Sequence, residues 1–135
     1  MKFFILSLAS FFALQCCAQQ PEIVLGPGIE IEDHDHDFGE VQQTDFTEYI
    51  YCEFTIKNIG TEPLIISKCK GTCGCTTPEC SQEPILPGET GTVRVRYDSY
   101  RVGNFAKSVT LYSNATNEPE KKIWIRGTVI ERTKG

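Results

Sequence analysis

Short runs in which every second residue is apolar dominate the chain after residue 28. The clearest run is 49–57, and similar runs occupy 92–98, 108–113 and 121–129. A two-residue period is typical of a strand with one buried face and one face in water. No stretch of useful length repeats apolar residues at helical spacing. About seven short strands separated by polar turns predict an all-β fold, an antiparallel β-sandwich.

The alternation also predicts which side chains form the core, because successive side chains of a strand point to opposite faces. We expect the following side chains to lie between the sheets: Phe54, Ile56, Leu64, Ile66, Val93, Val95, Val109, Leu111, Ile123 and Ile125. The same alternation turns Trp124 and Arg126 outward. Tryptophan and arginine are enriched in binding hot spots, which makes both residues binding candidates. The alternative is a tryptophan that lies over its own strand neighbours or under the N-terminal tether, since single exposed apolar residues are common.

The first eighteen residues have the pattern of an export signal. A positively charged start precedes an apolar run over 3–14, which is shorter than the roughly 20 residues that span a bilayer and suits a secretory signal. Small residues at Cys16 and Ala18 permit cleavage before Gln19. Alternatively, the four residues that end at Cys17 resemble a relaxed bacterial lipobox, in which Cys17 is acylated and becomes the first residue. Both routes predict an extracytoplasmic protein that is periplasmic, outer-membrane-anchored or secreted, without a further transmembrane segment.

Length and charge narrow the picture further. The chain has 135 residues, of which 40% are hydrophobic and 23% charged, and this is one globular domain's worth of sequence. We expect a signal peptide over 1–18, a tether bounded by proline and glycine over 19–28, the sandwich over 29–131 and a tail over 132–135. The net charge is -5 and no basic cluster is present, which excludes nucleic acid as a partner.

If cleavage follows Ala18, five cysteines remain: Cys52, Cys69, Cys73, Cys75 and Cys80. An exported protein meets an oxidising environment, which favours disulfides, and an odd number leaves at least one thiol. Cys52 and Cys69 are equally far from the turn at 60–61, so we expect them to pair. Cys80 should then pair with Cys73 or Cys75, because a Cys73–Cys75 bond must close across Gly74 alone. The remaining sulfur of that pair would be exposed and reactive.

Two other interpretations of the segment from Cys69 to Cys80 remain open. Four thiolates suit a tetrahedral zinc ion, and a Cys-x-Cys pair can hold a soft ion such as Cu(I). A strained disulfide is also easily reduced, which favours redox chemistry. The spacing lacks the two C-x2-C pairs of a zinc ribbon, and an oxidising compartment opposes free thiolates. We therefore expect a disulfide-stapled loop without a cofactor.

Other candidate chemistry is sparse. The run from Asp33 to Asp37 alternates aspartate and histidine, so in a strand His34 and His36 share one face and the aspartates the other. These side chains would not converge on one metal ion. The sequence shows no Ser-His-Asp or Cys-His arrangement and no phosphate-binding loop. We predict that the protein is not an enzyme.

Several segments, in this order, resemble a known family. They are HDFGEV at 36–41, FTIKNIG at 54–60 with PLII at 63–66, CGCTTP at 73–78 with PGE at 87–89, and GNF at 103–105 with IRGTV at 125–129. The chain resembles the secreted bacterial domain-of-unknown-function family 1573 over roughly 29–130. The resemblance implies an immunoglobulin-like sandwich similar to Hydin and major-sperm-protein modules and an exported location, but no established activity. Cys52, Cys69 and Cys80 depart from the family pattern.

Together the residues and the resemblance predict an exported, non-catalytic binding or structural module of the bacterial cell envelope. Its partner would be a protein or an envelope component, and a lipid anchor at Cys17 remains an alternative to simple cleavage. The competing hypothesis is a thiol redox or metal-handling protein that uses the segment from Cys69 to Cys80.

Overall fold

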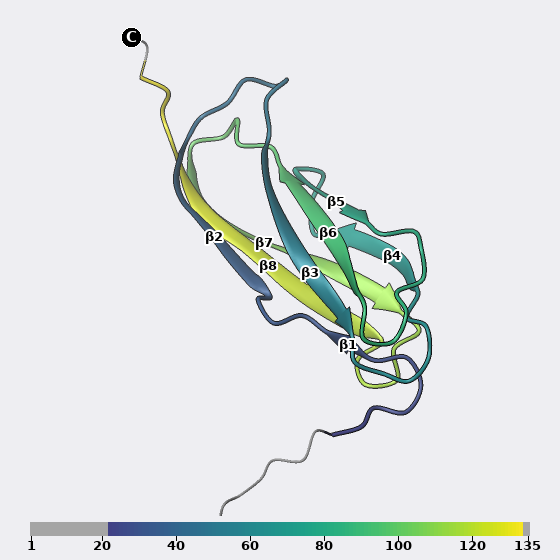
Figure 1. Cartoon of the computed structure of the whole chain (residues 1–135). Coiled ribbons are helices and arrows are strands. Elements are labelled where there is room, and N and C mark those ends of the chain that lie inside the picture. Colours follow the sequence, from purple (N-terminus) through teal and green to yellow (C-terminus); the bar gives the residue numbers. More distant parts are fainter. Residues whose placement is uncertain (1–21, 134–135) are drawn as a thin grey trace, which may run out of the picture.

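The computed structural model describes residues 22–133, so the signal peptide and acylation site expected over 1–18 lie outside it. Within the described residues the chain forms eight strands and no helix (Figure 1). No helix in this part is therefore long and apolar enough to cross a membrane. The strands are β1 (Ile29–Glu30), β2 (Asp35–Gln42), β3 (Ile50–Asn58), β4 (Ile66–Gly71), β5 (Thr76–Cys80), β6 (Thr90–Tyr97), β7 (Gly103–Ser113) and β8 (Glu120–Ile130).

The strands form two four-stranded sheets that pack face to face. The strand order is β1-β3-β6-β5 in the first sheet and β2-β8-β7-β4 in the second. All ten side chains predicted for the core are at most 7% exposed, so the predicted register is confirmed. The core also takes in aromatic rings, because Tyr97 stacks on Phe105 with the ring centroids 4.0 Å apart. The predicted immunoglobulin-like β-sandwich is confirmed.

One strand pair differs from the expected antiparallel pattern. β1 pairs antiparallel with β3 over two residues, and the chain then crosses to the other sheet, where β2 runs parallel to β8. The register of β2 shifts between Asp37 and Glu40. Gly39 adopts a φ of 64° there, and its N–H donates to Asp37 Oδ1 at 2.8 Å.

The C-terminal part of the predicted tether packs against the domain. Val24 forms a parallel bridge with Gly60, and the Thr61 N–H donates to the Gly26 carbonyl at 2.7 Å. A Cβ atom at Gly60 would collide with the Gly26 oxygen and the Gly28 nitrogen. Glycine is therefore required at position 60 by the close approach of two backbones. From Val24 onward the chain belongs to the folded unit.

Asn58, at the end of β3, holds this region together. Its side chain is fully buried. Oδ1 accepts the N–H groups of Gly28 at 3.3 Å and Gly60 at 2.9 Å. Nδ2 donates to the carbonyl oxygens of Glu62 and Ile85, each at 2.8 Å. Both donors and both acceptor positions of the amide are used, so one side chain joins three separate segments of backbone.

Candidate functional site

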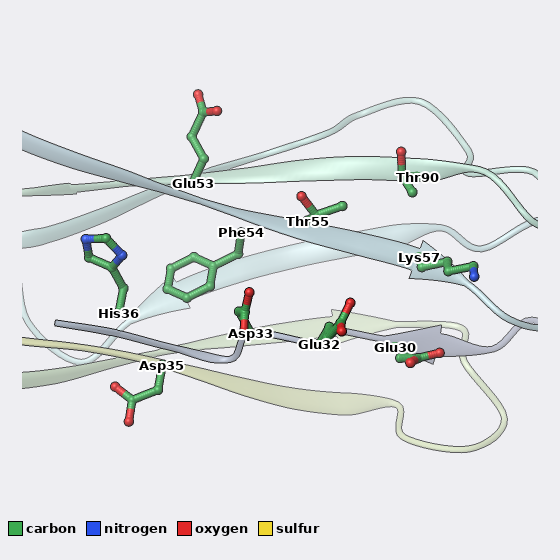
Figure 2. Close-up of a pocket in the computed structure, with 10 residues that line it drawn as sticks. All are labelled: Glu30, Glu32, Asp33, Asp35, His36, Glu53, Phe54, Thr55, Lys57 and Thr90. Carbon is green, nitrogen blue, oxygen red and sulfur yellow. The ribbon is translucent and has the colours of Figure 1, made fainter.

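A groove of about 540 Å³ opens between β3 and the segment that crosses from β1 to β2 (Figure 2). The ring of Phe54, which is 3% exposed, forms its floor. The His36 ring stands edge-on to Phe54 with the centroids 6.5 Å apart. The sequence pattern did not reveal this groove, because only the fold brings the run at 30–36 beside β3.

Carboxylates dominate the lining of this groove, which we call the acidic groove. They belong to Glu30, Glu32, Asp33, Asp35 and Glu53, whereas Lys57 contributes the one lysine or arginine side chain of the lining. Asp35 is engaged, because its carboxylate accepts from Arg126 at 2.9 Å. The other four carboxylates form no ion pair with any side chain in residues 22–133. The lining of the groove therefore carries a net negative charge, although Arg94 lies opposite Glu53 and Lys57 opposite Glu30 in the sheet.

Trp124 and Arg126 lie on the outer face of β8, as the alternation predicts, and Trp124 is 45% exposed. Arg126 bridges Asp35 and Asp37 of β2 at 2.9 and 3.2 Å. The Gly39 N–H and the Arg126 guanidinium hold the pKa of Asp37 below its usual value. Arg126 thus links β2 to β8, and its charge is already paired.

From Asp35 onward the histidine and the aspartates are distributed as a strand requires. Asp33, however, precedes β2 and is directed toward β3, whereas Asp35 is directed away from β3 (Figure 2). The expected common face of the three aspartates is therefore wrong. Asp35 and Asp37 share the face that meets Arg126, whereas His36 lies on the other face with its ring 4.6 Å from that of Phe38. Within residues 22–133, no three His, Cys, Asp or Glu side chains are grouped to hold a metal ion.

The structure pairs Cys69 with Cys80 and Cys73 with Cys75. The expected Cys52–Cys69 bond is wrong, because the turn after β3 carries the chain into the other sheet. The expected partners of Cys80, Cys73 or Cys75, are also wrong, because Cys80 forms its disulfide with Cys69 across the sandwich. Cys52 is the one unpaired cysteine of the described residues and is buried, not exposed. Burial raises the pKa of its thiol to about 12.

The Cys69–Cys80 bond closes one side of the sandwich. Cys69 lies on β4 and Cys80 on β5, and these are edge strands of different sheets. Their Cα atoms are 6.4 Å apart, within the usual range for a disulfide. The two sheets are therefore joined covalently at this side.

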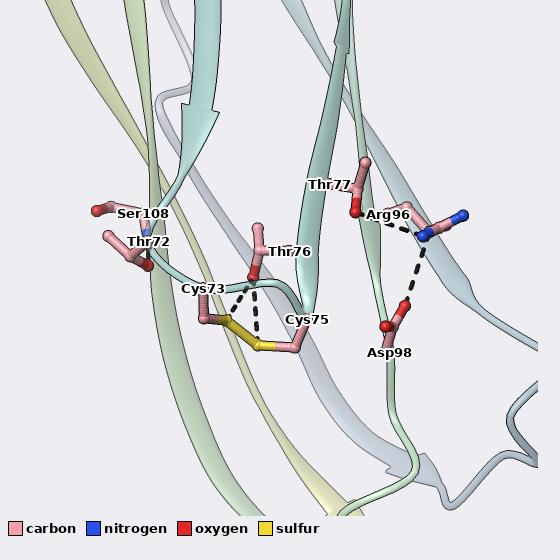
Figure 3. The surroundings of a disulfide bond; sticks show 8 residues. All are labelled: Thr72, Cys73, Cys75, Thr76, Thr77, Arg96, Asp98 and Ser108. Carbon is pink, nitrogen blue, oxygen red and sulfur yellow. Dashed lines mark hydrogen bonds and ion pairs between the residues drawn. A yellow bond between two sulfur atoms is a disulfide. The ribbon is translucent and has the colours of Figure 1, made fainter.

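The Cys73–Cys75 bond lies in the turn between β4 and β5 (Figure 3). Both cysteines are half-buried, and the Thr76 hydroxyl lies 3.6 Å from Cys73 Sγ and 3.9 Å from Cys75 Sγ. A Cβ atom at Gly74 would meet nothing within 4 Å, so the turn faces open space. Since each sulfur of the 69–80 segment is held in a disulfide, none is a thiolate available to a metal ion.

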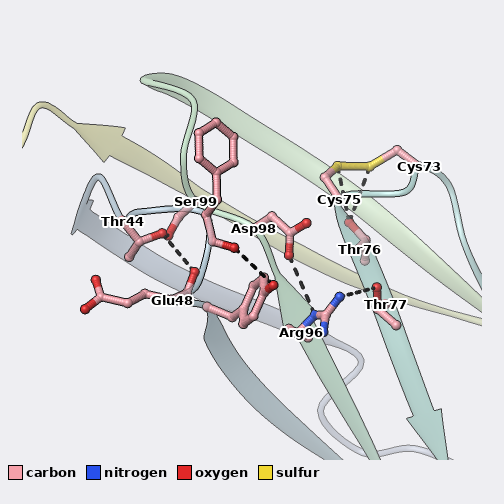
Figure 4. A network of polar contacts seen from close by, with 11 residues as sticks. Thr44, Glu48, Cys73, Cys75, Thr76, Thr77, Arg96, Asp98 and Ser99 are labelled. Atoms are coloured by element: carbon pink, nitrogen blue, oxygen red, sulfur yellow. Dashed lines mark hydrogen bonds and ion pairs between the residues drawn. A yellow bond between two sulfur atoms is a disulfide. The ribbon is translucent and has the colours of Figure 1, made fainter.

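Polar contacts beside this turn fix the neighbouring loops (Figure 4). The Arg96 guanidinium lies 4.1 Å from the centre of the Tyr49 ring and donates to the Thr77 hydroxyl at 3.4 Å. The Ser99 hydroxyl is fully buried and lies 2.9 Å from that of Thr44. The Thr44 and Ser99 hydroxyls contact each other, Thr44 also donates to the Glu48 carbonyl, and the Thr77 hydroxyl contacts the Arg96 guanidinium. Nothing in this network activates a nucleophile.

Two face-to-face sheets of this strand order, with β2 switching to the second sheet, define an immunoglobulin-like β-sandwich. A family model described as a protein of unknown function (DUF1573) matches residues 29–129. The chain belongs to this family, which confirms the resemblance drawn from the sequence.

Solved structures share the fold at low sequence identity. A protein of unknown function from Porphyromonas gingivalis W83 is 18% identical with a TM-score of 0.66, covering 78% of this chain and 48% of that one. The ASH/PapD-like domain 7 of human CEP192 is 15% identical with a TM-score of 0.58, covering 78% and 87%. The secreted serine protease VesC from Vibrio cholerae is 10% identical with a TM-score of 0.59, covering 79% and 24%.

The chain spans about half the length of the Porphyromonas protein and about a quarter of VesC. No curated protein matches the sequence. Similarity at this level of identity establishes the fold, and a fold by itself does not specify an activity.

Proposed function

We propose that the mature chain is a non-catalytic, immunoglobulin-like binding or structural module of the bacterial cell envelope. The observation that carries this proposal is the Cys69–Cys80 bond between edge strands of the two sheets. Disulfides form and persist in oxidising compartments, which favours a location outside the cytoplasm. The export pattern of the first eighteen residues supports the same location, whether cleavage leaves Gln19 or an acylated Cys17.

The proposed partner is a protein or an envelope component. An acidic chain repels nucleic acid, and the hydroxyl groups near the disulfides lack an activating base. Four carboxylates of the acidic groove are unpaired within the described part of the chain, which supports binding rather than catalysis.

Protein recovered from its native host tests both parts of the proposal. The intact mass and the N-terminal peptide should show a chain that begins at Gln19 or at acylated Cys17. Non-reduced peptide mapping should find two disulfides and one thiol that is alkylated only after unfolding. A chain that retains Met1 would overturn the export proposal. Five alkylatable thiols with bound metal would overturn the structural role of the cysteines in favour of metal handling.

A redox role for Cys73 and Cys75 is the second candidate function. The observation that favours it is the Thr76 hydroxyl close to both sulfurs of a half-buried bond, since this hydroxyl could donate to a thiolate after reduction. Equilibration in glutathione buffers would then reduce this bond at potentials where Cys69–Cys80 persists. With dithiothreitol as the electron donor, which reduces Cys73–Cys75 to the dithiol and is itself oxidised, the protein should accelerate insulin reduction, and a Cys73→Ser/Cys75→Ser variant should not. Reduction of the two bonds at the same potential, without insulin reduction, would overturn the redox role.

A further inference from the structure

The edge of β3 that faces away from β6 is open over most of its length. β1 covers this edge at two positions, where Ile29 and Glu30 pair with Asn58 and Lys57. Beyond Glu30 the chain leaves for the other sheet. On its opposite side β3 pairs with β6 over 50–57 without a register shift, so the open edge is regular.

Hydrogen bonds at the end of β3 show which residues direct backbone groups to this edge. The Asn58 N–H donates to the Glu89 carbonyl at 3.0 Å, and the Asn58 carbonyl accepts from the Gly88 N–H at 2.9 Å. Both bonds lie on the β6 side. The N–H of the next residue, Ile59, donates to the Gly28 carbonyl at 3.1 Å, on the β1 side. Successive residues of an antiparallel strand alternate in this way. The residues that present N–H and C=O groups at the open edge are therefore Tyr51, Glu53 and Thr55.

The other edges of the sandwich are protected, whereas this one is not. On the same side, the β2 edge is interrupted by its bulge between Asp37 and Glu40, and bulges discourage pairing. On the far side, the β4 and β5 edges are tied together by the Cys69–Cys80 bond. Within residues 22–133 no strand pairs with β3 at Tyr51, Glu53 or Thr55 on the open side. An exposed, regular edge of this kind is a template for an added strand.

The chemistry beside the edge specifies the occupant. The open edge borders the acidic groove, where the carboxylates of Glu32, Asp33 and Glu53 are unpaired within the described chain. Figure 2 shows Glu53 on one side of β3 and the Phe54 ring on the other, directed at the crossing segment. An added strand has side chains on both faces. One face would meet Glu53, and the other would meet the Phe54 ring together with the carboxylates of Glu32 and Asp33, which lie between β3 and the crossing segment (Figure 2).

We propose that the open edge of β3 binds an extended, basic segment of a partner protein as an added strand. Backbone groups of the segment pair with Tyr51, Glu53 and Thr55, and its Lys or Arg side chains contact the acidic groove. This inference rests on the proposed role as a binding module and names the class of partner.

The mature, disulfide-bonded protein can be titrated with a synthetic heptapeptide of alternating lysine and valine, followed by calorimetry. Binding is expected to weaken with added salt, because the carboxylates are exposed and screened. A peptide with glutamate in place of lysine should not bind. Two further lysine-valine peptides, N-methylated at every lysine or at every valine, each lack the backbone donors of one edge, because successive N–H groups of a strand point to opposite edges. The peptide that lacks the donors facing β3 should bind at least about tenfold more weakly than the other. Equal binding of both methylated peptides and the unmethylated peptide would overturn the added-strand geometry.

Amide hydrogen exchange gives a residue-level test that needs no variant. In the free protein, the N–H groups of Tyr51, Glu53 and Thr55 should exchange faster than those of Cys52 and Phe54. The peptide should slow exchange at the first three positions and leave the other two unchanged. Peptide binding without this alternating protection would overturn the proposal.

Variants test the charges separately from the backbone. Glu32→Gln, Asp33→Asn and Glu53→Gln should each weaken the lysine-valine peptide by about threefold. The matched control is Glu120→Gln, at the start of β8 and outside the groove, which should leave the affinity unchanged. Unchanged affinity in the triple variant would overturn the role of the groove. Failure of the peptide to bind would overturn this inference alone, because export and disulfide mapping test the proposed function independently.

Discussion

Replacing Asn58 with aspartate exchanges one amide nitrogen for oxygen in a fully buried site. The first oxygen keeps its two donors, the N–H groups of Gly28 and Gly60. The second oxygen faces the carbonyls of Glu62 and Ile85, each of which lies 2.8 Å from the present Nδ2. The substitution therefore removes two hydrogen bonds with almost no change in volume.

The loss of unfolding free energy depends on whether the introduced carboxyl group is protonated. An ionised carboxylate loses both donated bonds and meets two carbonyl oxygens, which should lower the unfolding free energy by about 3–5 kcal/mol. A protonated carboxyl can still donate to one carbonyl, so the loss should be about 1–2 kcal/mol. Burial and the two carbonyls raise the pKa of this group above its unfolded value. The folded variant then holds a proton that the unfolded chain has released, so its stability falls as pH rises through that window.

Urea denaturation followed by far-UV circular dichroism measures this effect as the difference from wild type at about pH 4 and about pH 7. Asn114→Asp is the matched control. The Asn114 amide also accepts from the Ile65 N–H at 2.8 Å and donates to the Pro63 carbonyl at 3.2 Å. The Asn114 side chain, however, is exposed. The control should lose less than about 1 kcal/mol at either pH. A loss in Asn58→Asp that is equally small, or equal at both pH values, would refute the reasoning.

Three further predictions follow from the core and the cysteines. Cys52 should resist alkylation until the chain unfolds. Because burial raises its pKa from 9.0 to about 12, the unfolding free energy should fall as pH rises above about 9. The fall should be smaller in Cys52→Ala, which keeps the contribution of Tyr97, whose pKa burial also raises. Cys69→Ser/Cys80→Ser should lower the unfolding free energy by about 3 kcal/mol, whereas the serine variant of the other bonded pair should lose about 1.5 kcal/mol because its loop is much shorter. Phe54→Ala should lose about 3–5 kcal/mol, and a melting temperature within a degree or two of wild type would contradict its burial.

The core could be predicted from the sequence because burial in a sandwich alternates locally along each strand. Val93 and Ile123 were placed correctly without knowledge of their partners. Strand pairing is a property of residues far apart in the chain, so the parallel β2–β8 pair left no signal in the periodicity. β5 was missed for a related reason, since its five residues (Thr76–Cys80) lack an apolar alternation. The acidic run at 30–37 was visible, but its position beside β3 depends on where the chain changes sheet.

The cysteine pairing failed at a specific step. Equal distance from the turn at 60–61 places Cys52 opposite Cys69 only if the turn joins neighbouring strands of one sheet. In the structure this turn joins β3 to β4 in different sheets, so the relevant neighbour of Cys69 lies across the sandwich. The total of two disulfides and one unpaired thiol among residues 22–133 agrees with the expectation.

The acidic side chains beside β3 also bear on which partner an open edge would accept. A regular edge can pair with the same edge of a second copy, and natural proteins often place charges there to prevent it. Two copies of this chain would bring Glu53 and the carboxylates of the crossing segment together with like charge, on molecules that each carry a net charge of -5. A basic segment is attracted to the same edge, because each of its cations neutralises a carboxylate. The same residues would therefore disfavour self-pairing and favour a basic partner, which is how repulsion and attraction combine to give specificity.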